Sequence, residues 1–101
     1  MSKKTIYISG QITGLDINEA ISKFKDAEDF IKKEMPEYTP LNPFDICEQS
    51  DDNTWLDYMR ADIKALVDCE AIIMLDNWKE SNGAILELKI AQGLKMEIYY
   101  L

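Results

Sequence analysis

The sequence contains no histidine and only two cysteines, Cys47 and Cys69, which form no CxxC motif. These absences exclude histidine-based acid–base and triad chemistry, and also the usual zinc sites built from cysteine and histidine. The N-terminal lysines, Lys3 and Lys4, are not followed by an apolar signal region. We therefore expect a cytoplasmic protein whose two thiols are reduced.

Long hydrophobic runs and positive charge are also scarce. The longest apolar run is residues 71–75, far short of the roughly 20 residues that a membrane-spanning helix needs. The chain has 11 Lys and Arg against 19 Asp and Glu, a formal net charge of −8. This average field repels DNA and RNA, because nucleic-acid affinity comes largely from neutralising phosphates. A small anion is still compatible, since one local cluster of amides can hold it. We expect a small-molecule ligand, with no nucleic-acid polymer and no membrane as partner.

What the sequence does contain is a regular alternation of strand and helix patterns over 101 residues, which predicts a single domain over 1–101. The periodicity predicts strands over 4–9, 38–41, 71–75 and 96–101, and helices over 17–35, 54–67 and 84–92. Pro40 marks an edge strand, Ser81 an N-cap and Gly93 the C′ residue of the last helix, and residues 42–53 a long loop. This order predicts a small doubly wound, flavodoxin- or Rossmann-like α/β fold. Its parallel sheet has about four strands, with helices on both faces.

Two helix carboxylates fall on apolar stripes. Glu87 lies three residues after Ala84 and four before Ala91, which places it on the core-facing stripe of the last helix. Burial would raise its pKa, and displaced carboxylates of this kind are frequent at active sites. Asp62 borders the apolar stripe of the helix before it. The alternative for each is an ordinary stripe-edge carboxylate, with Glu87 reaching water and Asp62 pairing with a neighbouring cation.

Ligands of open parallel sheets bind beyond the carboxyl ends of the strands, where residues 9–14, 42–53 and 76–83 meet. Tyr7 lies on the opposite face of its strand from Ile6 and Ile8, either as a core residue or to hold a carboxylate. The loop 10–14 is neither GxGxxG nor a P-loop, so by itself it predicts no phosphate site. Nine residues near this edge are candidates for substrate binding: Ser9, Gly10, Gln11, Ile12, Trp55, Tyr58, Ser81, Asn82 and Gly83.

Three segments resemble the nucleoside 2-deoxyribosyltransferase superfamily, and most of all its short bacterial and phage members: 6–10 (IYISG), 62–63 (DI) and 81–88 (SNGAILEL). The resemblance runs from about Lys4 to Tyr99. It implies that Glu87 is the nucleophile that attacks C1′ of the sugar, that Asp62 assists proton transfer to the leaving base, and that Tyr7 orients the nucleophile. This is the chemistry of a retaining glycosidase and needs neither a metal nor an organic cofactor.

Two departures from that family concern the substrate. Ser81 lies six residues before Glu87, where transferases acting on free nucleosides carry an aspartate. It resembles instead the deoxynucleoside 5′-monophosphate N-glycosidases, whose serine contributes to phosphate binding. Thr13 stands where those hydrolases carry an arginine, so phosphate binding would rely on Ser81, the amides of residues 10–14 and a neighbouring subunit. Family enzymes also continue beyond the position of Leu101, and a neighbour's C-terminal segment helps to complete their site.

The leading hypothesis is an enzyme that cleaves the N-glycosidic bond of a deoxynucleoside 5′-monophosphate. The alternatives are a non-catalytic nucleotide-binding module of the same fold and a structural oligomerising domain. Ile85, Leu86 and Ile90 lie off the core-facing stripe, so the last helix is apolar almost all round. We therefore expect a homodimer or larger homo-oligomer, unless loop 42–53 folds over this helix.

Overall fold

The computed structural model describes residues 4–46 and 53–101, and its centre is a four-stranded parallel sheet. The strands lie in the order β2-β1-β3-β4, and all three strand pairs are parallel. Their bounds are Lys4–Ser9 (β1), Tyr38–Leu41 (β2), Ala71–Met74 (β3) and Glu97–Tyr100 (β4). The predicted α/β fold is confirmed, and β2, which contains Pro40, is an edge strand as expected.

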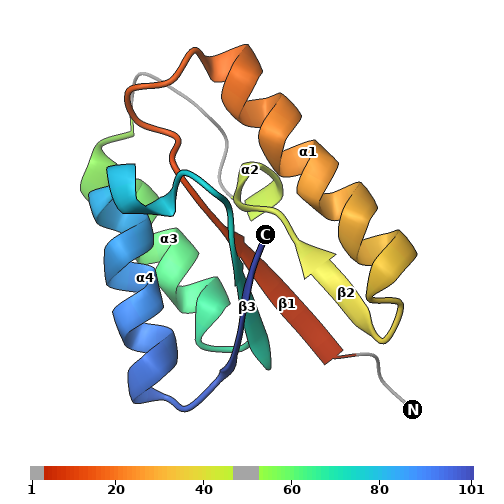
Figure 1. Ribbon diagram of the computed structural model, residues 1–101. Coiled ribbons are helices and arrows are strands. Elements are labelled where there is room, and N and C mark those ends of the chain that lie inside the picture. Colours follow the sequence, from red (N-terminus) through yellow and green to blue (C-terminus); the bar gives the residue numbers. More distant parts are fainter. Residues whose placement is uncertain (1–3, 47–52) are drawn as a thin grey trace.

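Helices cover both faces of this sheet (Figure 1). The helix α1 lies on one face, and α3 and α4 lie side by side on the other. The bounds are Ile17–Glu34 (α1), Pro43–Ile46 (α2), Trp55–Leu66 (α3) and Asn82–Gly93 (α4), with a 3₁₀ turn η1 at Trp78–Glu80. Within the described ranges, no helix is both long and apolar enough to cross a bilayer.

The two faces form two separate cores because side chains alternate along each strand. On one face Ile6 and Ile8 pack with Phe24 of α1. On the other face Tyr7 packs with Leu66 of α3 and with residues of α4. The opposite orientation of Tyr7 from its two neighbours, predicted from the strand period, is confirmed. A tyrosine hydroxyl is thereby brought underneath the two helices that carry Asp62 and Glu87.

Helices α3 and α4 both begin at side-chain caps, which set where their first residues lie. Thr54 and Asp57 form a capping box at α3, in which each side chain accepts a hydrogen bond from the other residue's backbone N–H. Ser81 Oγ accepts from the backbone N–H of Ala84 at 3.1 Å and so caps α4, as predicted. Since Ser81 also follows β3 closely, the N-terminus of α4 lies at the carboxyl edge of the sheet.

Two local predictions were wrong. Residues 43–46 form the short helix α2 within the segment predicted as a loop over 42–53, of which 47–52 lie outside the described residues. Gly93 belongs to α4, and the left-handed residue that ends the helix is Lys95, with φ of 58°. The amides of Lys95 and Met96 donate to the carbonyls of Gln92 and Ala91, a Schellman arrangement whose C′ residue is Lys95.

Candidate active site

A pocket opens at the carboxyl edge of β1, between the first loop (residues 10–14), α3 and the N-terminus of α4. The pocket lies where the strand order reverses direction: from β1 the chain continues to β2 on one side of it, and β3 pairs with β1 on the other side. Such a switch point is where open α/β sheets bind ligands. The side chains around the pocket come from five segments: Tyr7, Ile8, Gly10, Ile12, Thr13, Phe24, Pro43, Trp55, Tyr58, Met59, Asp62, Ser81, Gly83, Ala84 and Glu87.

Glu87 is buried at the base of this pocket, with 5% of its surface exposed. Both of its oxygens accept hydrogen bonds from hydroxyls of β1. Tyr7 Oη donates to Oε2 at 2.8 Å, and Ser9 Oγ donates to Oε1 at 2.7 Å. These two bonds fix the orientation of the carboxylate, and charge-assisted bonds of this kind are the stronger class.

Burial and hydrogen bonding act on Glu87 in opposite directions. Desolvation raises the pKa of Glu87 to about 7, although the bonds from Ser9 and Tyr7 favour the ionised form and lower it. The negative charge of Asp62 raises it further. A carboxylate with this pKa is partly ionised near neutral pH.

Asp62, on α3, is the second buried carboxyl, with 8% of its surface exposed. Desolvation raises the pKa of Asp62 to about 7, and the neighbouring Tyr7 hydroxyl favours the ionised form and lowers it. A carboxyl with this pKa is partly protonated near neutral pH, and its protonated form is able to donate a proton. Tyr7 interacts with both carboxyls, so the three side chains form one cluster contributed by β1, α3 and α4.

The other candidates divide into those that line the pocket and those that do not. Gly10, Ile12, Trp55, Tyr58, Ser81 and Gly83 line it, and Thr13 does so too. Ser9 is bonded to Glu87 but is not among the lining residues, and neither are Gln11 and Asn82.

The first loop is tied to the end of β3 by a contact that sequence reasoning missed. The backbone N–H of Gln11 donates to Asn77 Oδ1 at 3.1 Å. This amide is therefore engaged, although the amides of 10–14 were expected to receive a phosphate. Gly10 also packs closely against Leu75, just after β3, where a Cβ at position 10 would lie 2.7 Å from Leu75 Cδ1. A polar residue at a strand end is a weak signal in the sequence, since loops there are polar in any case.

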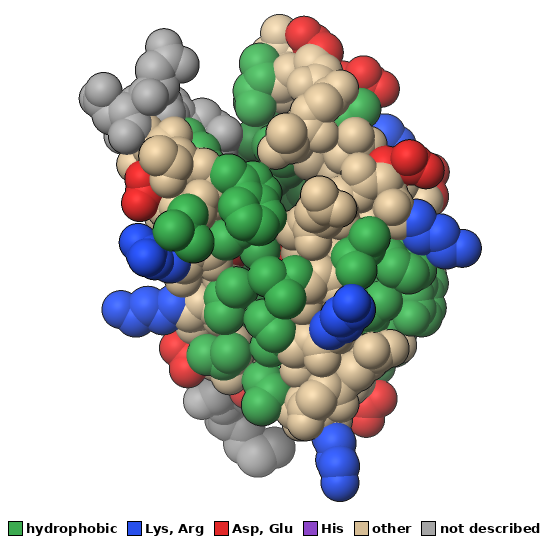
Figure 2. Space-filling model, turned by 90° about the vertical axis from the view of Figure 1, so that its left-hand side faces the viewer, with side chains coloured by type: hydrophobic (Ala, Val, Ile, Leu, Met, Phe, Trp, Pro, Cys, Tyr) green, Lys and Arg blue, Asp and Glu red, His purple; other side chains and the backbone are tan. Residues whose placement is uncertain are grey.

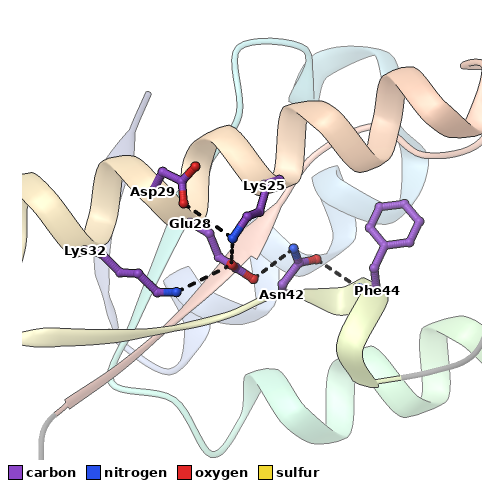
Figure 3. Close-up of polar contacts among 6 residues, drawn as sticks. All are labelled: Lys25, Glu28, Asp29, Lys32, Asn42 and Phe44. Atoms are coloured by element: carbon purple, nitrogen blue, oxygen red, sulfur yellow. Dashed lines mark hydrogen bonds and ion pairs between the residues drawn. The ribbon is translucent and has the colours of Figure 1, made fainter.

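The opposite wall of the pocket is held by polar contacts between α1 and the start of α2 (Figure 3). Glu28 accepts from Asn42 Nδ2 at 3.2 Å and pairs with Lys25 and Lys32. Asn42 Oδ1 in turn accepts from the backbone N–H of Phe44. Because Pro43 lies between Asn42 and Phe44 and lines the pocket, this network fixes one side of the entrance.

Apart from this pocket, the notable surface is the outer side of α3 and α4 (Figure 2), where hydrophobic side chains gather. Leu56 on α3 and Leu86 on α4 are 49% and 39% exposed, and Trp55 at the pocket is 50% exposed. Among the described residues, no group of three or more Asp, Glu or Cys side chains could hold a metal ion. The polar side chains gathered at the base of the pocket are carboxyls and hydroxyls.

The sequence of residues 4–100 matches the model of a family described as a domain of unknown function, DUF4406. The chain belongs to this DUF4406 family. Among curated proteins, none matches this chain.

The fold is similar to that of a solved enzyme structure. The chain is similar to a 2-desoxiribosyltransferase from Leishmania mexicana, with a TM-score of 0.66 and 24% sequence identity. The match covers 97% of this chain and 63% of that one, so this chain spans less than two thirds of the length of that enzyme. The similarity shows that the DUF4406 chain has a nucleoside 2-deoxyribosyltransferase-like fold, as its motifs predict.

The buried carboxyls predict an unusual dependence of stability on pH. The pKa values of Asp62 and Glu87, ordinarily 3.8 and 4.5, are each raised to about 7 by folding. Between pH 5 and 7 the native state therefore binds more protons than the unfolded state, so stability falls as pH rises. We expect the free energy of unfolding in urea to fall from pH 5 to pH 8 by on the order of 3 kcal/mol for each carboxyl.

Between pH 5 and 8 no histidine titration adds to the change in stability, because the chain has no histidine. The lowered pKa values of Asp57 and Glu70 act below pH 4.5 and in the opposite direction. Substitution Glu87→Gln should remove the Glu87 contribution and so roughly halve the pH dependence, whereas Glu34→Gln, at an exposed position on α1, should leave it unchanged. A wild-type protein that is equally stable at pH 5 and pH 8 would contradict the raised pKa values.

Proposed function

We propose that this DUF4406 protein is an enzyme that cleaves the N-glycosidic bond of a deoxynucleoside 5′-monophosphate, with Glu87 as its nucleophile. The observation that carries the proposal is the buried Glu87 carboxylate, oriented by two hydroxyls and facing a pocket that it shares with Asp62. The likeness of its fold to that of a 2-desoxiribosyltransferase supports the same class of chemistry.

In the first step Glu87 attacks C1′ of the sugar while the bond from C1′ to the base nitrogen breaks. Asp62 gives its proton to the departing base, which leaves as a neutral molecule. The product on the enzyme is a glycosyl ester of Glu87. In the second step Asp62 takes a proton from water or another acceptor, whose oxygen or nitrogen bonds to C1′ and releases Glu87.

The pocket has features that suit a nucleotide. The rings of Trp55 and Tyr58 line one wall and offer flat surfaces for a base. Ser81 lines the pocket at the N-terminus of α4, where its hydroxyl proton and the first amides of the helix can face a phosphate. A carboxylate at position 81 would repel that phosphate, so we assign Ser81 to discrimination between nucleotides and nucleosides.

Release of free base, measured by chromatography from the four common deoxynucleoside monophosphates and the matching deoxynucleosides, tests this proposal. Wild type should release base faster from the monophosphates. Ser81→Asp retains a good helix cap but adds a negative charge, so we expect KM for the monophosphate to rise at least about tenfold. The same change on exposed α1, Ser22→Asp, is the matched control and should leave KM unchanged.

The possible outcomes separate the alternatives. If the protein releases base from nucleosides and Ser81→Asp does not change that rate, the phosphate-binding role of Ser81 is wrong, but the N-glycosidase activity stands. Saturable binding of nucleotides without any release would favour a non-catalytic binding module. If the protein neither binds nucleotides nor releases base, the proposal is contradicted entirely.

We also propose that copies of this chain associate through the outer side of α3 and α4. The exposed Leu56 and Leu86 are large apolar side chains on adjacent helices, and contiguous apolar surface of this kind is typical of interaction sites. Trp55 directly precedes Leu56 in the chain and lines the pocket, so association at Leu56 would bring a second copy close to the pocket entrance.

A further inference from the structure

The two oxygens of Glu87 have different partners, although both partners come from the same strand. Oε1 accepts from Ser9 Oγ at 2.7 Å, and Oε2 accepts from Tyr7 Oη at 2.8 Å. Tyr7 and Ser9 are two residues apart on β1 and so point to the same face of the sheet. Their side chains are fully enclosed, with 0% and 1% of the surface exposed.

Only one of the two hydroxyl-bearing residues is part of the pocket wall. Tyr7 and Glu87 both line the pocket, whereas Ser9 does not. Oε1 is therefore bonded to a residue outside the pocket lining, whereas Oε2 is bonded to Tyr7, which belongs to the lining.

We propose that Ser9 is a positioning residue that holds Oε1 of Glu87 as the non-attacking oxygen, so that Oε2 forms the bond to the sugar. This inference rests on the proposed function. Without the Ser9 hydroxyl, the carboxylate would be held at one oxygen only and could rotate about its last side-chain bond. Attack requires a fixed orientation, because small misplacements of a reacting atom are costly in rate.

The two hydrogen bonds have different fates during the reaction. When Oε2 bonds to C1′, the electron pair of the C1′–N bond leaves with the base, which takes the proton of Asp62. Oε1 then becomes the carbonyl oxygen of the ester and continues to accept from Ser9. Oε2 becomes the singly bonded ester oxygen, a weaker acceptor, which frees the Tyr7 hydroxyl to donate to Asp62.

This exchange of partners favours the second step. A hydrogen bond newly donated by Tyr7 would lower the pKa of Asp62, and esterification also removes the negative charge of Glu87 from its neighbourhood. Asp62 is then better held as a carboxylate, which is the state that accepts a proton from water. As water oxygen bonds to C1′, the C1′–Oε2 bond breaks and Glu87 regains both hydroxyl partners.

Substitution Ser9→Ala tests the inference with two readouts. The first is turnover: kcat should fall about 10- to 100-fold with KM nearly unchanged, because the lost bond orients the nucleophile and touches no substrate. The second is independent of activity and uses the protein without substrate. The pKa of Glu87, followed by carboxyl NMR, should rise by about one unit, because its ionised form loses a hydrogen bond.

Ser22→Ala, on the exposed side of α1, is the matched control and should change neither readout. Ser9→Cys keeps a weak donor of similar size, so intermediate values are expected for both. Urea unfolding of each variant confirms that the fold is retained.

The readouts distinguish this inference from the proposed function. An unchanged Glu87 titration in Ser9→Ala would overturn the role of Ser9, whether or not the wild type shows turnover. A rise in KM with kcat unchanged would overturn it as well. Wild type without turnover would overturn the assignment of an attacking oxygen together with the proposed function, even if the Glu87 pKa moved as expected.

Discussion

Substitution Glu87→Gln should reduce base release at least about 10³-fold while the domain remains folded. The amide has nearly the size of the carboxylate, so the packing of α4 against β1 is kept. It cannot form the ester with C1′, because an amide oxygen is a poor nucleophile. The loss should appear in kcat for every substrate that the wild type accepts, whatever its base.

Stability gives this variant a second signature. The ionised Glu87 is destabilised by burial, so its neutral replacement should unfold at a urea concentration no lower than that of wild type at pH 8. Glu34→Gln is the matched control, because Glu34 is exposed on the last turn of α1 and should tolerate the change without loss of activity. Undiminished turnover by Glu87→Gln would contradict the assignment of the nucleophile.

Substitution Asp62→Asn should reduce base release by about 10² to 10⁴, the usual contribution of a general acid. The size of the loss should depend on the base, because protonation matters only when the departing base is a poor leaving group. A deoxynucleotide whose purine is methylated at N7 carries a positively charged base and can leave without a proton. On that substrate we expect Asp62→Asn to lose less than about tenfold.

The pH profile gives a further measurement on the same variant. Wild type requires a protonated Asp62 and an ionised Glu87, so its kcat/KM should pass through a maximum near neutral pH. The two apparent pKa values of this profile belong to the coupled pair of carboxyls and not to either residue alone. Asp62→Asn should lose the decline at high pH. Asp68→Asn, an exposed change in the turn that follows α3, serves as control. Equal losses on ordinary and N7-methylated substrates would argue against proton donation by Asp62.

Much of the fold followed from local periodicity, because spacing alone decides which side chains share a face. The position of Glu87 between Ala84 and Ala91 placed it on the core-facing stripe, which left a buried and a water-facing carboxylate as alternatives, and the structure has it buried. The strand period predicted that Tyr7 faces away from Ile6 and Ile8. These are properties of a single helix or strand. They hold wherever that element packs, provided that its apolar face forms a core.

Contacts between distant segments were less accessible. The bond from Ser9 to Glu87 joins residues 78 positions apart, and a small hydroxyl in a strand has many other partners in principle. The bond between Gln11 and Asn77 likewise depends on how two loops meet at the sheet edge. Both required knowledge of which strands are neighbours.

The helix end at Lys95 illustrates a different limit. Glycine is the preferred residue for a left-handed helix terminus, so Gly93 was the natural prediction for C′. The helix continues through Gly93 instead, and the Schellman hydrogen bonds of Lys95 and Met96 offset the cost of a positive φ at Lys95. The position of the turn before β4 therefore decides which residue is left-handed, and it outweighs the preference for glycine there.

Rapid acid quenching of the purified protein during turnover of a deoxynucleoside monophosphate, followed by mass spectrometry, tests the central claim most directly. We predict that a fraction of the chain gains the mass of the deoxyribose phosphate group, and that peptide mapping places it on Glu87. Glu87→Gln should show no such adduct. Base release by wild type with no adduct on Glu87, or with an adduct on another residue, would contradict the account.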